Sequence, residues 1–383
     1  MLCVAGFLTV AANGMANPLL PLFAASLGAS SVFVGFVVAS YWLTRIFVEF
    51  PSGLISDRIG RRIPIIVGLL ISSISAVWSS FSTNPFDLTL ARSVWGIGAA
   101  LFFSPATALL VDLFKVGRGR ALGTFQGIEF VGSFLGAPLG GYLAELFGFN
   151  IALIVCGVLS FAGFAVVLSS RELKNVGAAP FRRARVSLRG SLGSLRSWGM
   201  FVICCAAFSR LFVMQGIHST VFPLYANRQL GIDLSMIGFI LGVRSAGLAI
   251  ATVSAGTLSD RVGRRPILFV GSLLSGVALS LYPLARTVEG LLSLMFLDGV
   301  ALGAISVMLP VLVPEAVGPE STGAAMGVYR TFFAFGAVAG PILLMIASDY
   351  FGMVFCFYIA SAAILINLPI MFGLRKKRTS SEL

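Results

Sequence analysis

Nine ionisable side chains lie inside long apolar stretches of this 383-residue chain. They are Arg45, Glu49, Arg92, Glu129, Arg210, His218, Arg244, Asp298 and Arg330. A charge within an apolar stretch is costly if that stretch crosses a lipid bilayer, and charges kept there mark paths for ions or substrates. These residues are therefore the first candidates for a functional site.

Proton coupling requires a group whose pKa changes with its surroundings. Glu129 and Asp298 are predicted to bind a proton or a cationic substrate, and Glu49 is a third candidate. Arg92 is predicted to tune the pKa of a carboxylate. The single histidine, His218, is interpreted as a packing residue.

The excess of arginine in these stretches favours a different substrate. Five arginines stand against three acids, and the planar guanidinium group suits carboxylates and phosphates. An organic anion could therefore bind Arg210, Arg244 or Arg330. Arg45 and Glu49 are four residues apart on one helix face and are expected to pair. The aromatic residues Tyr41, Trp42, Trp95 and Tyr329 suit an amphipathic molecule.

The stretches that hold these charges are predicted to be transmembrane helices. The chain is 57% hydrophobic and 11% charged, with a mean hydropathy of +0.98, whereas a soluble domain is about 25% charged. Its apolar runs are continuous, as in helices, and do not alternate as barrel strands do. Twelve spans are predicted, at 2–25, 31–54, 63–83, 87–112, 120–146, 149–169, 198–225, 234–257, 266–285, 288–313, 322–347 and 351–373.

The basic residues indicate how the chain is oriented. Of its 27 Lys and Arg residues, we assign 20 to one set of alternate loops and the C-terminal tail, and two to the opposite loops. This asymmetry predicts that both termini lie in the cytoplasm. The expected location of the chain is the plasma (inner) membrane. The net charge of +12 is therefore not interpreted as a nucleic-acid surface.

A repeated decapeptide indicates an internal duplication. Gly53, Asp57, Arg58, Gly60, Arg61 and Arg62 recur as Gly256, Asp260, Arg261, Gly263, Arg264 and Arg265, 203 positions later. Asp112 is echoed by Glu315 at the same interval. The predicted organisation is a six-helix bundle at 1–169, a basic cytoplasmic linker at 170–197, and a second six-helix bundle at 198–383 with a short basic tail.

The two decapeptides, each placed in the loop after the second span of a half, resemble the signature of the major facilitator superfamily. This resemblance covers the whole chain and implies an all-α membrane protein with two pseudo-symmetric six-helix bundles. It also implies a substrate site between the bundles and alternating access. The chain further resembles the twelve-span drug:proton antiporter branch. That likeness rests on Arg92, Gly96, Gly98, Gly132, Gly136 and Pro138, with Gly327, Gly336, Gly340 and Pro341 in the eleventh span.

The repeated acids and arginines are expected to form two charge networks. Asp57, Arg61 and Asp112 would form one, and Asp260, Arg264 and Glu315 the other, with the same spacing of 55 between the acids. Both are predicted to hold the halves closed on the cytoplasmic side. The family resemblance implies in addition that Asp57 caps the eleventh helix. Gly60 and Gly263 are expected to permit tight turns, and the glycines inside spans are expected to permit close helix packing.

Together these features predict a secondary active transporter that works by alternating access and exports a small organic or amphipathic compound. Protons are the expected coupling ion, with no other cofactor and no metal. The expected partners are a small-molecule substrate and the bilayer, and the expected state is a monomer. Uptake or exchange of an organic anion is one alternative, and an uncoupled facilitator or a receptor is another. An ATP-driven pump is not expected, because no phosphate-binding Gly-Lys loop is present. An enzyme is not expected, because the sequence shows no soluble domain that could host chemistry.

Overall fold

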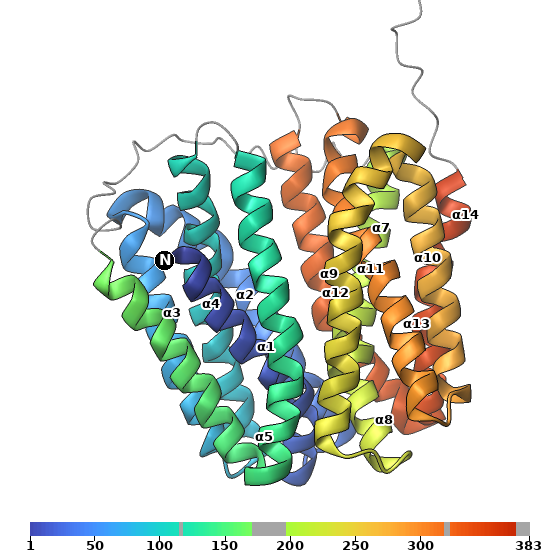
Figure 1. The fold of residues 1–383 in the computed structure, drawn as a ribbon, viewed down its shortest axis with the longest axis horizontal. Coiled ribbons are helices and arrows are strands. Elements are labelled where there is room, and N and C mark those ends of the chain that lie inside the picture. Colours follow the sequence, from blue (N-terminus) through green and yellow to red (C-terminus); the bar gives the residue numbers. More distant parts are fainter. Residues whose placement is uncertain (115–117, 171–196, 318–321, 373–383) are drawn as a thin grey trace, which may run out of the picture.

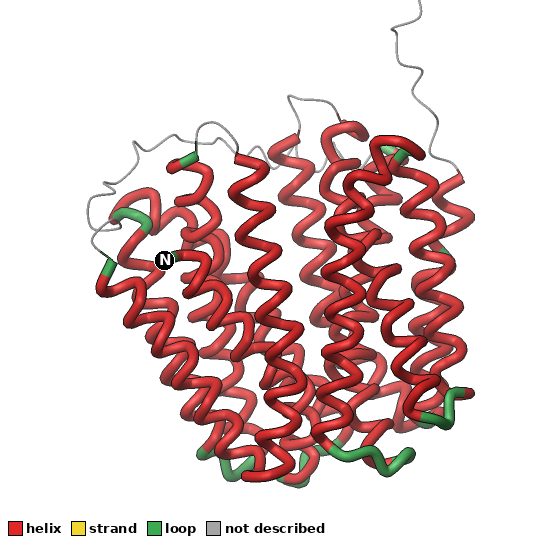
Figure 2. Tube along the Cα trace, in the orientation of Figure 1, coloured by secondary structure: helices red, strands yellow, loops and turns green. Residues whose placement is uncertain are grey.

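The computed structural model describes the chain except for residues 115–117, 171–196, 318–321 and 373–383, and describes only the backbone of 118–122, 260, 323 and 324. All regular elements in the described part are helical (Figure 2). The first half contains α1 (Leu2–Ser26), α2 (Ser31–Ile59), α3 (Arg62–Ser80), α4 (Pro85–Leu113) and α5 (Arg118–Ser169). Most of the predicted linker, 171–196, lies outside the described residues.

The second half stands beside the first (Figure 1). It contains α7 (Trp198–Val213), η2 (Met214–Val221), α8 (Phe222–Arg228), α9 (Leu234–Val262), α10 (Arg264–Leu281), η3 (Tyr282–Leu284), α11 (Val288–Val317), α12 (Thr322–Phe351), α13 (Met353–Leu365) and α14 (Asn367–Phe372). The helices α7, η2 and α8 run on without a break and form the seventh span, Trp198–Arg228.

Eleven helical segments in the described chain are long and apolar enough to cross a membrane. One of them crosses twice, which gives twelve crossings. The extra crossing lies in α5, which is 52 residues long and contains Gly148 with φ 84° and ψ 168°. Only glycine adopts this conformation readily, so the chain turns back there. The predicted fifth and sixth spans are therefore the two arms of α5, and the expected twelve-span, two-bundle fold is confirmed.

The main error in the predicted boundaries lies in the repeated decapeptide. It was expected to be loop, but α2 continues to Ile59 and α9 to Val262. The polar residues there are compatible with a helix, so they extend it beyond the apolar core. The loops begin only at Gly60 and Gly263, which have φ values of 92° and 94°. We call the end of the bundle that carries these two glycines the basic end.

The conformation of the turns repeats along the chain. Glycines with positive φ occur at Gly28 and Gly231, Gly60 and Gly263, and Gly148 and Gly352. The first two pairs are separated by 203 residues and the third by 204. Close helix contacts repeat as well. A methyl group added at Gly136 of α5 would lie 2.3 Å from the Ala11 carbonyl oxygen, and one at Gly340 of α12 would lie 2.3 Å from that of Phe212.

Two seams join the halves away from the basic end. In the first, a methyl group at Gly35 of α2 would lie 2.6 Å from the Pro341 carbonyl oxygen of α12. In the second, one at Gly238 of α9 would lie 2.4 Å from the Ala137 carbonyl oxygen of α5. Gly35 and Gly238 are themselves 203 residues apart. The backbones therefore touch at equivalent points on both sides of the molecule.

Toward the basic end the same helices separate. A methyl group added at any of four glycines there would meet no described atom within 4 Å; these are Gly123 and Gly127 of α5, Gly256 of α9 and Gly327 of α12. Figure 1 shows α5 and α9 approaching each other at the bottom of the view and diverging toward the top. The structure is therefore closed at the end opposite the basic loops and open toward them. The packing contact predicted for Gly327 is absent in this conformation.

Candidate functional site

Arg92 is buried in the first half among neutral groups. It is 2% exposed and extends from α4 toward α1, where its Nη2 donates to Asn17 Oδ1 at 2.9 Å and its Nη1 donates to Asn13 Oδ1 at 3.4 Å. Its guanidinium carbon lies 4.3 Å from the Tyr41 ring and 4.8 Å from the Trp95 ring. Amide oxygens and aromatic faces both stabilise a cation, so the positive charge is held without a described acid.

A second buried cluster, in the other half, is centred on the carboxylate of Asp298, which is 0% exposed. Ser275 of α10 donates to Asp298 Oδ1 at 2.6 Å. His218 Nε2 lies 2.7 Å from Asp298 Oδ2. Arg244 of α9 is near enough to interact electrostatically with this carboxylate, and the Tyr282 ring stands edge-on to His218 at 6.3 Å. We call these five residues the Asp298 cluster.

The segment that carries His218 has an unusual helical geometry. Met214–Val221 is a π-helix within the seventh span. The hydroxyl groups of Ser219 and Thr220 donate to the carbonyl oxygens of Met214 and Gln215, five residues earlier, at 3.3 and 2.8 Å. These bonds satisfy carbonyls in the widened turns. Because π-helical turns cost stability and are frequent at functional sites, the geometry itself marks this segment.

A third group of charges lies between the halves. Glu49 of α2 is 3.5 Å from Arg45 on its own helix and 3.7 Å from Arg330 of α12. Arg45 also interacts electrostatically with Glu129 of α5. Glu129 Oε1 is buried and has no hydrogen-bond partner among the described residues. The expected Arg45–Glu49 pair is therefore present, and it is extended across the boundary between the halves.

Aromatic rings surround this inter-half group. The rings of Trp42 in α2 and Phe333 in α12 are 6.1 Å apart and nearly perpendicular. The Arg45 guanidinium carbon lies 4.7 Å from the Trp42 ring, and that of Arg210 in α7 lies 5.7 Å from the Phe333 ring. Arg210 Nε has no hydrogen-bond partner among the described residues. The arrangement offers flat apolar faces together with charges of both signs.

The networks at the basic end connect helices of a single half. Arg61 forms ion pairs with Asp57 and, at 3.2 Å, with Asp112 of α4. Arg264 forms an ion pair with Glu315 of α11. These pairs tie α2 to α4 and α10 to α11. Because the structure is open at this end, the predicted role of these networks in holding the halves closed stays a prediction. The side chain of Asp260 lies outside the described residues.

The remaining predicted residues differ in their surroundings. Arg62 donates to the Leu168 carbonyl oxygen at 3.0 Å, and Arg58 and Arg261 are exposed. Arg265 is partly buried. Methyl groups at Gly96, Gly98, Gly132 and Gly336 would lie 2.2 to 2.7 Å from neighbouring atoms, so these helices pack closely. A methyl group at Gly53 would lie 3.5 Å from Ser104 Oγ.

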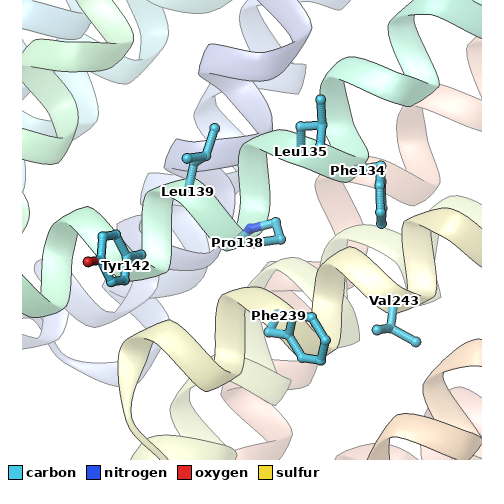
Figure 3. A pocket seen from close by; sticks show the side chains of 7 residues that line it. All are labelled: Phe134, Leu135, Pro138, Leu139, Tyr142, Phe239 and Val243. Atoms are coloured by element: carbon cyan, nitrogen blue, oxygen red, sulfur yellow. The ribbon is translucent and has the colours of Figure 1, made fainter.

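The two proline positions of the antiporter pattern lie at the seams. Pro341 faces Gly35, and Pro138 of α5 would lie 2.6 Å from a methyl group at Gly242 of α9. An apolar groove of about 280 Å³ follows the α5–α9 seam (Figure 3). Its lining includes Leu139 and Phe239, which are 51% and 50% exposed. An exposed apolar lining on a membrane-spanning bundle faces lipid, so this groove is distinct from the inter-half group.

Sequence reasoning missed the importance of His218 and of the two asparagines. His218 was interpreted as a packing residue, but it lies beside Asp298. Asn13 and Asn17 are four residues apart, which places both amides on one face of α1. An amide pair at this spacing in an apolar span, or a histidine followed by Ser219 and Thr220, would have been the available signals.

Solved structures of transporters have the same fold as this chain, although their sequences differ greatly from it. A mutant form of the nucleoside transporter NupG covers 98% of this chain and 99% of its own, with a TM-score of 0.80 at 14% identity. A bacterial homologue of the human lysosomal transporter Spinster, in its inward-facing and occupied conformation, has a TM-score of 0.81 at 16% identity. The match covers 97% of this chain and 94% of that protein. These similarities concern the fold alone.

Sequence comparisons identify the family. The chain is 26% identical to the multidrug resistance protein MdtG of Klebsiella pneumoniae, over 98% of this chain and 92% of that protein. It is 23% identical to the multidrug efflux protein YfmO of Bacillus subtilis, over 98% and 91%. The model of the Major Facilitator Superfamily matches residues 2–225 and 203–383. With its twelve spans in two bundles, this chain therefore belongs to the Major Facilitator Superfamily and is a membrane transporter, not an enzyme.

Proposed function

We propose that this transporter exports small amphipathic organic compounds in exchange for protons, from the plasma membrane and with its basic end in the cytoplasm. Export is supported by relatives that are named for multidrug resistance and efflux. The orientation is supported by the excess of basic residues in the loops on that side, following the positive-inside rule. The single observation that carries the substrate class is the inter-half group around Glu49.

That group presents what an amphipathic compound needs. Trp42 and Phe333 supply one aromatic face from each half, and stacking on such faces favours flat apolar molecules. Glu129 supplies a carboxylate oxygen that has no described hydrogen-bond partner and can accept from a basic substrate. A compound bound there touches both halves and so can favour one relative orientation over the other.

The proposed cycle uses the two seams as the outer gate. In the described conformation the substrate enters from the basic end, where α5 and α9 diverge (Figure 1). Release on the other side requires the Gly35–Pro341 and Gly238–Ala137 contacts to separate. Proton binding from outside and proton release to the cytoplasm then return the empty protein to the described conformation.

Transport of ethidium, a lipophilic cation, by purified protein in proteoliposomes tests the proposal. We expect ethidium to accumulate in an acidic lumen and the accumulation to collapse when nigericin dissipates the pH gradient. Trp42→Ala should raise the KM for ethidium by about tenfold through loss of ring contact. Trp198→Ala is the matched control, because Trp198 is 51% exposed at the start of the seventh span. Absence of both gradient-driven flux and ethidium counterflow would overturn the proposal.

Export or exchange of an organic anion is a second candidate, favoured by Arg210. This buried guanidinium group faces the Phe333 ring and keeps Nε without a described hydrogen-bond partner. Carboxyfluorescein, an aromatic anion, is the probe for this candidate in the same vesicles. Flux of carboxyfluorescein that is lost in Arg210→Gln, together with no flux of ethidium, would select the anion.

A further inference from the structure

We propose that the coupling proton binds between His218 and Asp298, and that its binding is transmitted through the π-helix to the Gly35–Pro341 seam. This inference rests on the proposed proton-coupled export and assigns it a site. It gives His218 a role as a proton-binding residue in place of the packing role expected from the sequence.

The geometry of the pair leaves room for one more proton. His218 Nε2 and Asp298 Oδ2 are 2.7 Å apart, yet neither atom is aligned for a hydrogen bond with any described residue. His218 Nδ1 is also without a described partner. Both side chains are at least 98% buried. Unsatisfied polar atoms at this depth are costly. A small rotation of the imidazole would align the pair, and a proton bound there would make the contact a charge-assisted hydrogen bond.

The charges around the pair are consistent with a single titrating proton. Arg244 of α9 interacts electrostatically with Asp298, so a neutral imidazole leaves the cluster with balanced charges. Ser275 of α10 donates to the other carboxylate oxygen, and the Tyr282 hydroxyl donates to Met295 Sδ at 3.3 Å. One added proton, carried by the imidazole or by the carboxyl group, raises the charge of the cluster by one. The electrostatic energy of such a charge change is large in a buried site.

The π-helix provides the element that can respond. His218 lies in the middle of Met214–Val221, where the backbone is held in widened turns by the hydroxyls of Ser219 and Thr220. Because His218 and Asp298 are already in contact, gain or loss of the proton changes the bond between them, and the segment that carries His218 can shift with it. A shift of His218 would therefore move the turns of this π-helix first.

Close backbone contacts connect this segment to the seam. A methyl group at Gly216 would lie 2.8 Å from the Gly340 carbonyl carbon of α12. The next residue of α12, Pro341, touches Gly35 of α2 across the halves through its carbonyl oxygen. Gly340 and Pro341 are thus held between the π-helix on one side and the first half on the other. A displacement of Gly216 therefore changes the contact that closes the outer end.

The test compares His218→Gln and Asp298→Asn with Glu289→Gln, an exposed carboxylate substitution on the same helix α11. We expect the first two variants to lose pH-gradient-driven ethidium transport by about tenfold or more. Ethidium counterflow, normalised to the folded fraction of each variant, should stay within about threefold of wild type. Counterflow needs no net proton movement, so it reports folding and substrate binding. Glu289→Gln should behave as wild type in both assays.

A distance measurement tests the transmission. Spin labels at Thr83 and Thr287, which are exposed in outer loops of opposite halves, are attached in a background without the five cysteines. Their distance distribution should change between about pH 5 and pH 8 and should stop changing in Asp298→Asn. Thr220→Val, which keeps both titratable groups, should alter the pH-dependent change by removing the hydroxyl bond to Gln215.

The outcomes separate this inference from the proposed function. If wild type shows no proton-driven transport, the proposed function fails and the inference fails with it. If wild type is proton-driven and both variants keep wild-type proton flux, only the His218–Asp298 assignment is wrong. An unchanged pH response of the labels in Thr220→Val would overturn transmission through the π-helix alone.

Discussion

The two halves share a backbone plan but differ in their buried charge. In the first half Gly96 packs on the carbonyl oxygen of Tyr41, and in the second half Gly299 packs on that of Arg244. Each residue of the second contact lies 203 positions after its counterpart in the first. At the position of Tyr41, which stacks on Arg92, the second half therefore has an arginine. At the position of Asp298 the first half has Trp95, and at the position of Arg92 the second half has Met295.

This difference teaches that the halves are suited to different tasks. Arg92 is surrounded by amides and rings, and a guanidinium group keeps its charge in any protein environment. The Asp298 cluster contains an imidazole, the side chain that changes charge most readily near neutral pH, beside a buried carboxylate. In the proposed mechanism the first half thus provides a fixed charge and the second a charge that changes with proton binding, although the same backbone contacts hold both.

The largest expected effect concerns what remains after each central residue is removed. Asp298→Leu leaves Arg244 as a buried cation without its acid, at a cost of about 3–5 kcal/mol. Arg92→Met leaves only neutral amides unpaired, at a cost of ~1–3 kcal/mol. Thermal unfolding in detergent, followed by intrinsic fluorescence, measures both. The double variant Asp298→Leu with Arg244→Met should regain much of the loss, and equal costs for the two single variants would remove the distinction between the halves.

The two seams between the halves should respond equally to an added methyl group, because their packing is equivalent. Gly35→Ala and Gly238→Ala each force a methyl group against a carbonyl oxygen of the partner half, which costs ~1–3 kcal/mol in the described conformation only. The population closed at the outer end should fall in both variants, as read by the Thr83–Thr287 label distance. Gly256→Ala, where no described atom lies within 4 Å, is the matched control and should leave the distribution unchanged.

A smaller effect is expected for the ion pair that crosses between the halves. Glu49→Gln removes the contacts with Arg45 and with Arg330, whose side chain is 66% exposed. Solvent screening limits the loss in stability to about 0–1 kcal/mol. Thermal unfolding should therefore change little, and a loss comparable with that of Asp298→Leu would contradict the view that solvent screens the Glu49–Arg330 pair. Glu289→Gln serves again as the exposed control.

The smallest effects should come from the networks at the basic end. Asp112→Asn and Glu315→Gln remove equivalent ion pairs with Arg61 and Arg264. Both acids are more than one-third exposed, so each loss should be about 0–1 kcal/mol and should shrink further in high salt. Labels at Ile59 and Val262, the exposed ends of α2 and α9, report the distance across this end. A clear shift of this label distance in either variant would support the predicted role of these networks in holding the halves closed.

The sequence predicted the fold well because its signals are strong in lipid. Long apolar runs must be helical, and the repeated decapeptide marks two equivalent halves. The decapeptide itself was assigned to loops because polar residues suggest solvent, whereas the helices continue beyond the apolar core to Gly60 and Gly263. Hydropathy measures where a helix leaves the membrane and not where it ends.

The candidate site was only partly predictable for a different reason. A charge inside a span is visible in the sequence, so Arg92, Glu129 and Asp298 were found. The partners of such a charge depend on how helices pack, so Asn13 and Asn17 were missed and the contact of His218 with Asp298 was not predicted. The π-helix that carries His218 was also missed, although the hydroxyl residues Ser219 and Thr220, which bond to its carbonyl oxygens, are visible in the sequence.

One contact at the outer end has a consequence for how readily that end opens. The carboxylate of Glu145, in α5, accepts a hydrogen bond at 2.8 Å from the backbone nitrogen of Leu234 at the start of α9 in the other half. One bundle thus satisfies the first turn of a helix in its twin, where the helix dipole is positive. When the bundles part, water and dissolved ions must take over from the carboxylate. In the proposed orientation, the medium outside the cell, and not the cytoplasm, therefore sets part of the free energy of exposing the binding site.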